Sequence, residues 1–181
     1  LLLLTLGLGS ISFVLLAGAQ VQRAFQRDLA GIGAVVGAKG SPMQLILSGV
    51  FHLDVPTGNV PLAQVKELAK HPQVAQVIPL SLGDSFEGFR IAGTTSDYVA
   101  HYRLQTARGR LWQQPMEAVL GVQVARATGL QPGQRFAGSH GLAGGDAHGS
   151  TPYQVSGVLA PCGCVADRLV AYSPETEPVD T

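Results

Sequence analysis

Cysteine, tryptophan and charged side chains are all scarce in this chain of 181 residues. It contains two cysteines and one tryptophan, and Asp, Glu, Lys and Arg together make up 13%. Twelve basic and twelve acidic side chains give a formal net charge of zero. Binding of nucleic acid calls for a stripe of basic side chains, so this balance argues against a nucleic-acid partner. The low charged fraction predicts instead that part of the surface is covered by lipid or by other chains.

The two cysteines, Cys162 and Cys164, are separated by one glycine. A structural zinc site built from cysteine needs more ligands than these two. A disulfide between residues so close in sequence would close a strained ring. We therefore predict two free thiols in a turn, with a redox pair or a soft-metal contact as the alternatives.

Motifs of catalytic and nucleotide-binding sites are also missing from the sequence. The glycine-rich stretch 31–41 ends in Gly37-Ala38-Lys39-Gly40, which breaks the Gly-Lys step of a P-loop. No GxSxG elbow accompanies Ser139-His140. We therefore predict no catalytic residue, no cofactor bound by this chain, and no enzymatic activity. Three other polar residues are expected in turns or on the surface: Asp84, Arg90 and Arg110.

The histidines give a weak metal signal. His52, His71, His101, His140 and His148 show none of the paired spacings that are typical of zinc sites. His140 and His148 share the glycine-rich loop 139–151 with Asp146, so these three residues are the only metal candidates. Because a flexible loop offers a metal little preorganisation, we expect solvated side chains there and no metal site.

The longest apolar run is the first stretch of the chain, and residues 1–22 contain no charged side chain. A helix of about 20 apolar residues crosses the hydrocarbon core of a bilayer and satisfies its own backbone hydrogen bonds. We predict a membrane helix over 1–22 that continues as a helix to about residue 30. One alternative is a secretory signal peptide cleaved after Ala17-Gly18-Ala19, although the basic n-region of a signal peptide is not visible. The other alternative is a buried core helix.

The rest of the chain mixes helical and strand periodicity, which predicts an α+β fold. Ser41, Asn59 and Ser96 are the expected helix caps, and Gly83-Asp84-Ser85 is the expected turn of a hairpin. A second, β-rich unit is expected to begin near Gly109. Expected helices cover 42–51, 61–70, the residues after Ser96, and 123–128; expected strands cover 32–37, 73–82, 89–93, 118–121, 134–139, 153–160 and 168–173.

Several longer phrases resemble the permease subunits of ABC transporters of the MacB, LolC and FtsX type. They are VVGAKGSPMQLILS, FHLDVPTGN, IPLSLGDSFEGFRIAGTT, VLGVQVARATGLQPGQRF and YQVSGVLAP, which together extend over most of the chain. One departure is Cys162-Gly163-Cys164, where the pattern has a hydroxyl residue near the second cysteine. The family has no catalytic residues that could be assigned to positions of this chain.

The resemblance implies a bacterial inner-membrane protein whose soluble part lies in the periplasm. Residues 23–108 would form an α/β, porter-like subdomain, and residues 109–181 a β-rich subdomain that is followed by the remaining membrane helices. A separate cytoplasmic ABC ATPase would hydrolyse ATP, and the permease would form a homodimer or heterodimer in the lipid bilayer. A periplasmic adaptor or cargo protein would be a further partner.

The function implied is coupling of ATP hydrolysis to motion of the periplasmic domain, in efflux, lipoprotein release or related transport. The alternative is a membrane-anchored periplasmic protein that binds a ligand or metal and acts without an ATPase. A secreted enzyme is a third possibility, and the missing catalytic motifs disfavour it.

Overall fold

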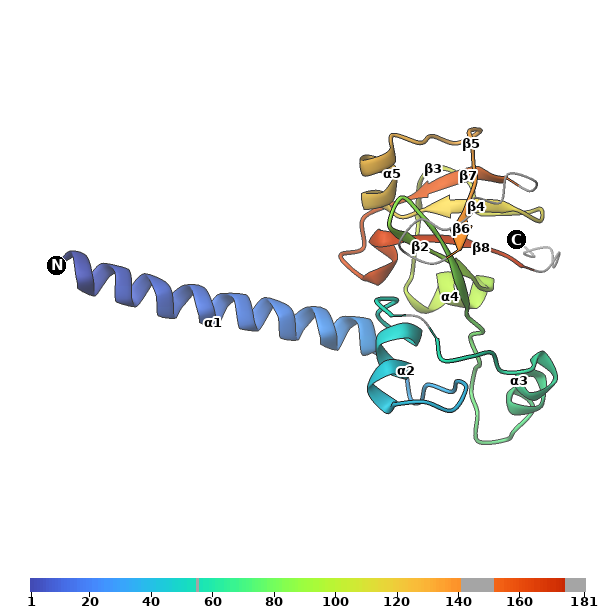
Figure 1. The fold of residues 1–181 in the computed structure, drawn as a ribbon, viewed down its shortest axis with the longest axis horizontal. Coiled ribbons are helices and arrows are strands. Elements are labelled where there is room, and N and C mark those ends of the chain that lie inside the picture. The colour runs from blue at the N-terminus through green and yellow to red at the C-terminus, as the bar shows by residue number, and fades with distance from the viewer. Residues whose placement is uncertain (55, 141–151, 175–181) are drawn as a thin grey trace. The chain divides into compact units, whose positions relative to one another are not determined.

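The computed structural model describes residues 1–54, 56–140 and 152–174. The chain divides into two compact units, Leu1–Ile32 and Gly33–Thr181, both drawn in Figure 1. The first unit is dominated by one helix, and the second combines short helices with a sheet. The α+β fold class predicted from the sequence is therefore confirmed, with an apolar N-terminal helix followed by a mixed α/β domain.

Helix α1 spans Leu2–Leu29 without interruption. At 1.5 Å per residue its 28 residues extend over about 40 Å, which exceeds the hydrocarbon thickness of about 30 Å. The predicted continuation of the helix to about residue 30 is confirmed. Gly31 follows in the left-handed region with φ of 81°, a conformation that glycine adopts without steric cost and that ends the helix.

The second unit begins with two short helices and then forms a sheet with helices beside it. Its elements are α2 (Pro42–Gly49), α3 (Leu62–Ala69), β1 (Ser81–Phe86), β2 (Phe89–Gly93), α4 (Ser96–His101), β3 (Thr106–Gly109), β4 (Glu117–Leu120), α5 (Val122–Thr128), β5 (Arg135–Phe136), β6 (Ser139–His140), β7 (Tyr153–Leu159), the 3-10 helix η1 (Val165–Arg168) and β8 (Leu169–Tyr172).

Within the described residues these strands form one eight-stranded sheet, in the order β3-β7-β4-β8-β2-β1-β6, with β5 paired to β7. The pairs β2–β8 and β4–β7 are parallel, and the others are antiparallel. Strand β2 comes from the first half of the second unit, and its partner β8 comes from the end of the described chain. The boundary expected between residues 108 and 109 therefore falls inside one sheet.

The two faces of the sheet carry separate apolar cores. Ile91, Leu120 and Val170 pack with residues of α5 on one face, and Ala92, Val119 and Leu169 pack with residues of α4 on the other. Figure 1 shows both helices beside the sheet. Because successive side chains of a strand point to opposite faces, buried neighbours such as Ile91 and Ala92 belong to different cores.

Some sequence predictions of local structure are wrong. Residues 32–37 and 73–80 form no strand, and Gly37 instead packs against the side chain of Leu45 in α2. The hairpin turn lies at Glu87-Gly88 rather than at residues 83–85. Both turn residues have positive φ, 47° and 81°, as the tight turn that suits the twist of two paired strands requires.

The predicted N-cap position of Ser41 is confirmed for α2, whereas Asn59 and Ser96 are not the N-cap residues of α3 and α4. The N-cap positions of α2, α3 and α4 are Ser41, Pro61 and Thr95, and none of these side chains makes a capping hydrogen bond. In contrast, strand 89–93 is confirmed, and the predicted stop of α5 at Gly129 is confirmed by its φ of 72°.

Candidate functional site

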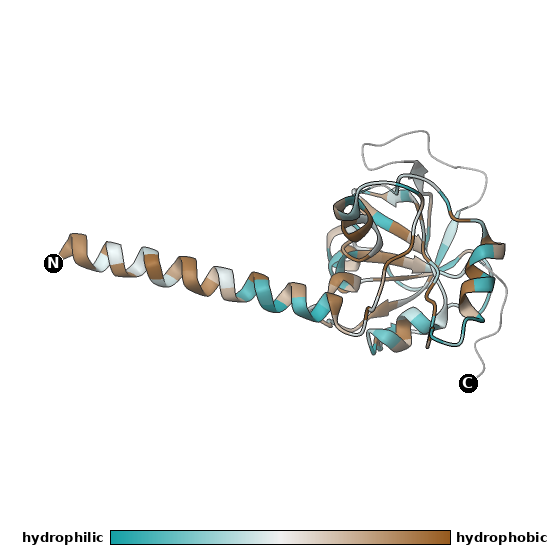
Figure 2. Ribbon diagram, turned by 90° about the horizontal axis from the view of Figure 1, so that it is seen from below, coloured by the Kyte–Doolittle hydropathy of each residue, from teal (hydrophilic) through white to brown (hydrophobic). Residues whose placement is uncertain are grey.

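The first functional feature is the apolar surface of α1. Side chains along this helix are largely exposed, for example Leu3 at 84%, Phe13 at 73% and Leu15 at 68%. Among the described residues, α1 is the one helix long and apolar enough to cross a membrane. Figure 2 shows its apolar residues in the N-terminal part and hydrophilic residues toward the C-terminal end. Exposed leucine and phenylalanine over several turns need a lipid or protein environment.

The second feature is a buried histidine after α2. His52 is 6% exposed and has a φ of 54°. Its Nδ1 donates to the carbonyl oxygen of Ser48 at 3.0 Å, so Nε2, 3.2 Å from the hydroxyl of Tyr98, accepts a hydrogen bond. The neutral ring satisfies both contacts. Burial lowers the pKa of His52 to about 4, and the positive charge of Arg90 acts in the same direction.

Arg90 on β2 is the third feature. It is 4% exposed, and its Nε and both Nη atoms are buried without a hydrogen-bond partner in the described structure. Burial lowers the pKa of this guanidinium, and attraction to Asp54 opposes that effect. A buried charge without hydrogen bonds costs free energy, so Arg90 lowers the stability of the fold at this position. The prediction from the sequence that Arg90 lies in a turn or on the surface is wrong.

His52, Tyr98, Arg90 and Asp54 together form what we call the His52–Arg90 cluster. His52 and Asp54 belong to the segment between α2 and α3, Tyr98 lies on α4 and Arg90 on β2. The cluster therefore connects the segment before the sheet with the sheet itself by one hydrogen bond and by electrostatic interactions. Sequence periodicity does not report it, because its members are distant in sequence.

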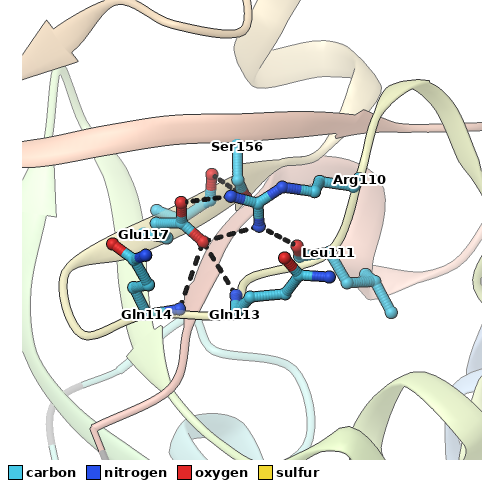
Figure 3. A network of polar contacts seen from close by, with 7 residues as sticks. Arg110, Leu111, Gln113, Gln114, Glu117 and Ser156 are labelled. Atoms are coloured by element: carbon cyan, nitrogen blue, oxygen red, sulfur yellow. Dashed lines mark hydrogen bonds and ion pairs between the residues drawn. The ribbon is translucent and has the colours of Figure 1, made fainter. Parts of the chain in front are cut away.

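A fourth feature is an ion pair that organises the loop before β4. Figure 3 shows the Glu117 carboxylate between the Arg110 side chain and the backbone of residues 113 and 114. Arg110 donates two hydrogen bonds, of 2.7 and 2.6 Å, to the two oxygens of Glu117. The N–H groups of Gln113 and Gln114 donate to Oε2 at 2.7 and 3.2 Å. These bonds lower the pKa of Glu117 and hold the loop that ends at Met116, whose φ is 63°.

Replacing Glu117 by alanine is expected to lower the free energy of unfolding by about 2–4 kcal/mol, because two backbone N–H groups and a guanidinium lose their acceptor. Glu117→Gln, which keeps one carbonyl acceptor, should lose about half as much. Urea unfolding of the full chain in detergent, followed by the fluorescence of buried Trp112 and by circular dichroism, measures both. Equal unfolding free energies for wild type and Glu117→Ala would show that the pair does not stabilise the fold.

The cysteine prediction is wrong, because Cys162 and Cys164 form a disulfide. Asp167 explains how the turn closes: its carboxylate accepts the N–H groups of Cys162 and Gly163, both at 2.9 Å. Gly163 has a φ of 65°, and the two cysteine Cα atoms lie 5.1 Å apart, within the range that a disulfide bridges. Sequence separation alone could not show that the backbone folds so tightly.

Two of the three predicted metal candidates lie outside the residues that the structure describes. His140 is the last residue of β6, and Asp146 and His148 lie outside the described residues. Within the described ranges, no group of three histidine, cysteine or acidic residues is placed to hold a metal ion. The prediction about the loop 139–151 is therefore not tested.

A small polar cavity lies beside the hairpin of β1 and β2. Its volume is about 190 Å³, below the range of about 300–1,000 Å³ that is usual for small-molecule sites. Burial raises the pKa of the nearby Tyr153, and Tyr172 and Asp84 act in the same direction. The cavity is lined by Asn59, Ser81, Leu82, Gly83, Asp84, Ile91 and Tyr172.

The comparisons with known proteins identify the family. A family model described as the MacB-like periplasmic core domain matches residues 1–174. The chain belongs to this family. The resemblance of the sequence to MacB-type ABC permeases is thereby confirmed, and a MacB-like domain together with an apolar helix fits a membrane protein with a periplasmic domain.

Two solved structures are similar to this MacB-like chain. The periplasmic region of MacB from Actinobacillus actinomycetemcomitans is 18% identical, with a TM-score of 0.45 over 65% of this chain and 56% of that one. The extracellular domain of the noncanonic ABC-type transporter YknZ from Gram-positive bacteria is 15% identical, with a TM-score of 0.42 over 62% of this chain and 61% of that one. The matched part is thus less than two thirds of either neighbour. Comparison with curated proteins gives no match.

Proposed function

We propose that this MacB-like chain is part of the permease subunit of a bacterial ABC transporter. In this proposal α1 crosses the inner membrane, and the second unit works in the periplasm. The observation that carries the proposal is the family match over residues 1–174, which includes the apolar helix as well as the folded domain. In this proposal a separate cytoplasmic P-loop ATPase hydrolyses the ATP.

The mechanical part of the proposal rests on α1. The helix continues from its apolar part through Arg23 to Leu29 without a break, and Leu29 stands only a few residues before the second unit. A continuous helix transmits displacement better than a flexible linker, because its backbone is held by hydrogen bonds at every residue. Closure of the ATPase dimer would thus be transmitted to the periplasmic domain, which moves a cargo or a partner protein.

The proposal that the chain is part of an ABC permease is tested by purifying the full-length protein from its own membranes in mild detergent. The bound chains are then identified by mass spectrometry. A P-loop ATPase in stoichiometric amount supports the permease. A preparation without any ATPase would favour the alternative, a membrane-anchored periplasmic binding protein that acts alone.

The coupling is tested by inserting Gly-Pro between Gln26 and Arg27, because glycine and proline both interrupt a helix. We expect the ATP-dependent fluorescence change of a label on Arg126→Cys, measured in nanodiscs with the ATPase, to fall at least tenfold. Circular dichroism and the Cys162–Cys164 disulfide should remain unchanged. An Ala-Ala insertion at the same point controls for added length and should retain more of the response. A full response after the Gly-Pro insertion contradicts coupling through α1.

A further inference from the structure

Four large apolar side chains of the second unit are exposed close to its beginning. Val36 is 65% exposed, Met43 64%, Ile46 37% and Leu53 63%. Val36 precedes α2, Met43 and Ile46 lie on α2, and Leu53 follows it. We call these four residues the α2 patch. An apolar group of this kind on a folded domain marks a surface that something else covers.

The contacts of α2 place these residues on this helix or next to it. Met43 and Ile46 are three residues apart and so lie on the same face of the helix. Val35 and Gly37 pack against Gly49 and Leu45 of α2, which brings the intervening Val36 next to the helix. The N–H of Leu53 donates to the carbonyl of Leu47 at 2.9 Å, so Leu53 lies at the end of α2.

The sequence around the patch is unusual in its charge. Between Gly33 and Leu53, Lys39 is the one side chain with a full charge, and it is exposed. The other titratable residue of this stretch, His52, is buried and neutral in its contacts. Asp54, which directly follows Leu53, is only partly exposed and interacts electrostatically with Arg90. An apolar surface with a nearby exposed cation suits the headgroup region of a bilayer that contains anionic lipids.

The covalent chain restricts where the patch can be. Six residues lie between Leu29, the end of α1, and Val36, and the seven residue-to-residue steps span at most about 25 Å. If α1 is anchored in a bilayer, the patch is therefore held at high effective concentration near the membrane surface. A distant protein partner has no such advantage.

We propose that the α2 patch docks on the surface of the same membrane that α1 crosses. Met43, Ile46, Val36 and Leu53 would enter the boundary between headgroups and acyl chains, while Lys39 lies among anionic headgroups. This inference rests on the proposed membrane anchoring by α1. Docking would hold the start of the second unit close to the bilayer. Motion of α1 would then act on a domain that already contacts the membrane surface.

The experiment measures the depth of fluorescent labels in the full chain, reconstituted in vesicles of phosphatidylcholine with about 30% phosphatidylglycerol. The anionic headgroups give these vesicles a negative surface potential. Single cysteines are introduced by M43C or L53C, and the native cysteines are protected because they form a disulfide. R126C on the exposed surface of α5 is the water-facing control, and F13C in α1 is the membrane control. Quenching by lipid-borne nitroxides is then compared with quenching by soluble iodide.

We expect lipid nitroxides to quench labels at 43 and 53 at least threefold more than the label at 126. Lys39→Gln should reduce this difference in the anionic vesicles and leave it unchanged in vesicles of phosphatidylcholine alone. Equal lipid quenching at 43, 53 and 126 overturns the proposal. Labels at 43 and 53 that are shielded from lipid nitroxides and from iodide alike would assign the patch to a contact with another chain instead.

The α1 label separates this inference from the proposal on which it rests. If the label at 13 is quenched by lipid and the labels at 43 and 53 are not, α1 is anchored and only the docking is wrong. If the label at 13 is quenched by iodide instead, the membrane anchor itself is wrong.

Discussion

Acidification from pH 6.5 to about pH 4 is expected to lower the free energy of unfolding of this MacB-like chain by up to about 3 kcal/mol, through His52. In the fold, burial lowers the pKa of His52 from 6.5 to about 4. Between these two values the unfolded chain binds a proton that the folded chain does not bind. Stability therefore falls as the pH decreases through this window and is fully present above pH 6.5.

The structural reason for the lowered pKa is clear in the contacts of the ring. Protonated His52 would carry its charge in a buried position beside Arg90, and its Nε2 would become a donor facing the Tyr98 hydroxyl. The second buried group with a titration effect is Glu117, whose pKa is lowered from 4.5. The contribution of Glu117 to the free energy of unfolding is lost only at pH values below about 4.5. The effects of His52 and Glu117 on stability therefore fall in different pH ranges.

Urea unfolding of the full chain in detergent at a series of pH values measures this effect. The variant His52→Gln cannot titrate and should show a nearly constant unfolding free energy between pH 6.5 and 4.5. The matched control is His71→Gln, which replaces an exposed histidine and should retain the wild-type pH dependence. A wild-type profile that is flat over this range would show that His52 is protonated in the fold or accessible to solvent.

Replacement of Arg90 by methionine is expected to raise the free energy of unfolding by about 1–3 kcal/mol, an unusual direction for a buried position. The guanidinium nitrogens are buried without hydrogen-bond partners. Methionine has a similar length, fills irregular spaces and removes the uncompensated polar groups. Loss of attraction to Asp54 acts in the opposite direction, and we expect it to be smaller because Asp54 is only partly buried.

Urea unfolding at pH 7.5 gives this difference without a contribution from His52. Arg90→Ala serves as the comparison, because it removes the same charge but also leaves a cavity, and it should be less stable than Arg90→Met. Arg90→Met should also raise the pKa of His52, since the nearby positive charge is gone, and so shift its acid window to higher pH. A large loss of stability in Arg90→Met would mean that the guanidinium makes interactions that stabilise the fold.

The two predictions concern one cluster of buried polar side chains. A buried charge that costs stability persists in proteins mainly where a functional surface or a moving part needs it. The His52–Arg90 cluster joins the segment after α2 to the sheet and α4. Under the proposed function, it lies where displacement of the N-terminal segment would reach the rest of the domain.

Much of this chain is determined by short-range sequence features. The uncharged run of residues 1–22 identifies the membrane-type helix, because apolar side chains over about 20 residues have few other stable environments. Strand 89–93 and helix α5 with its stop at Gly129 follow from local patterns, since apolar alternation and a glycine in the left-handed region act within a few residues. The family resemblance follows from phrases of this local kind as well.

What the tertiary structure decided depends on contacts between distant residues. Arg90 is predicted to be exposed by its sequence, but β2 lies between β1 and β8 in the sheet, and the segment that contains His52 and Asp54 interacts with the guanidinium. Cys162 and Cys164 read as thiols until Asp167 folds the turn that pairs them. The single sheet across residue 109 depends on the parallel pairing of β2 with β8, which are about 80 residues apart in sequence. Local patterns record propensity and burial over a few residues, and they carry no information about which distant chain segment supplies the other side of a contact.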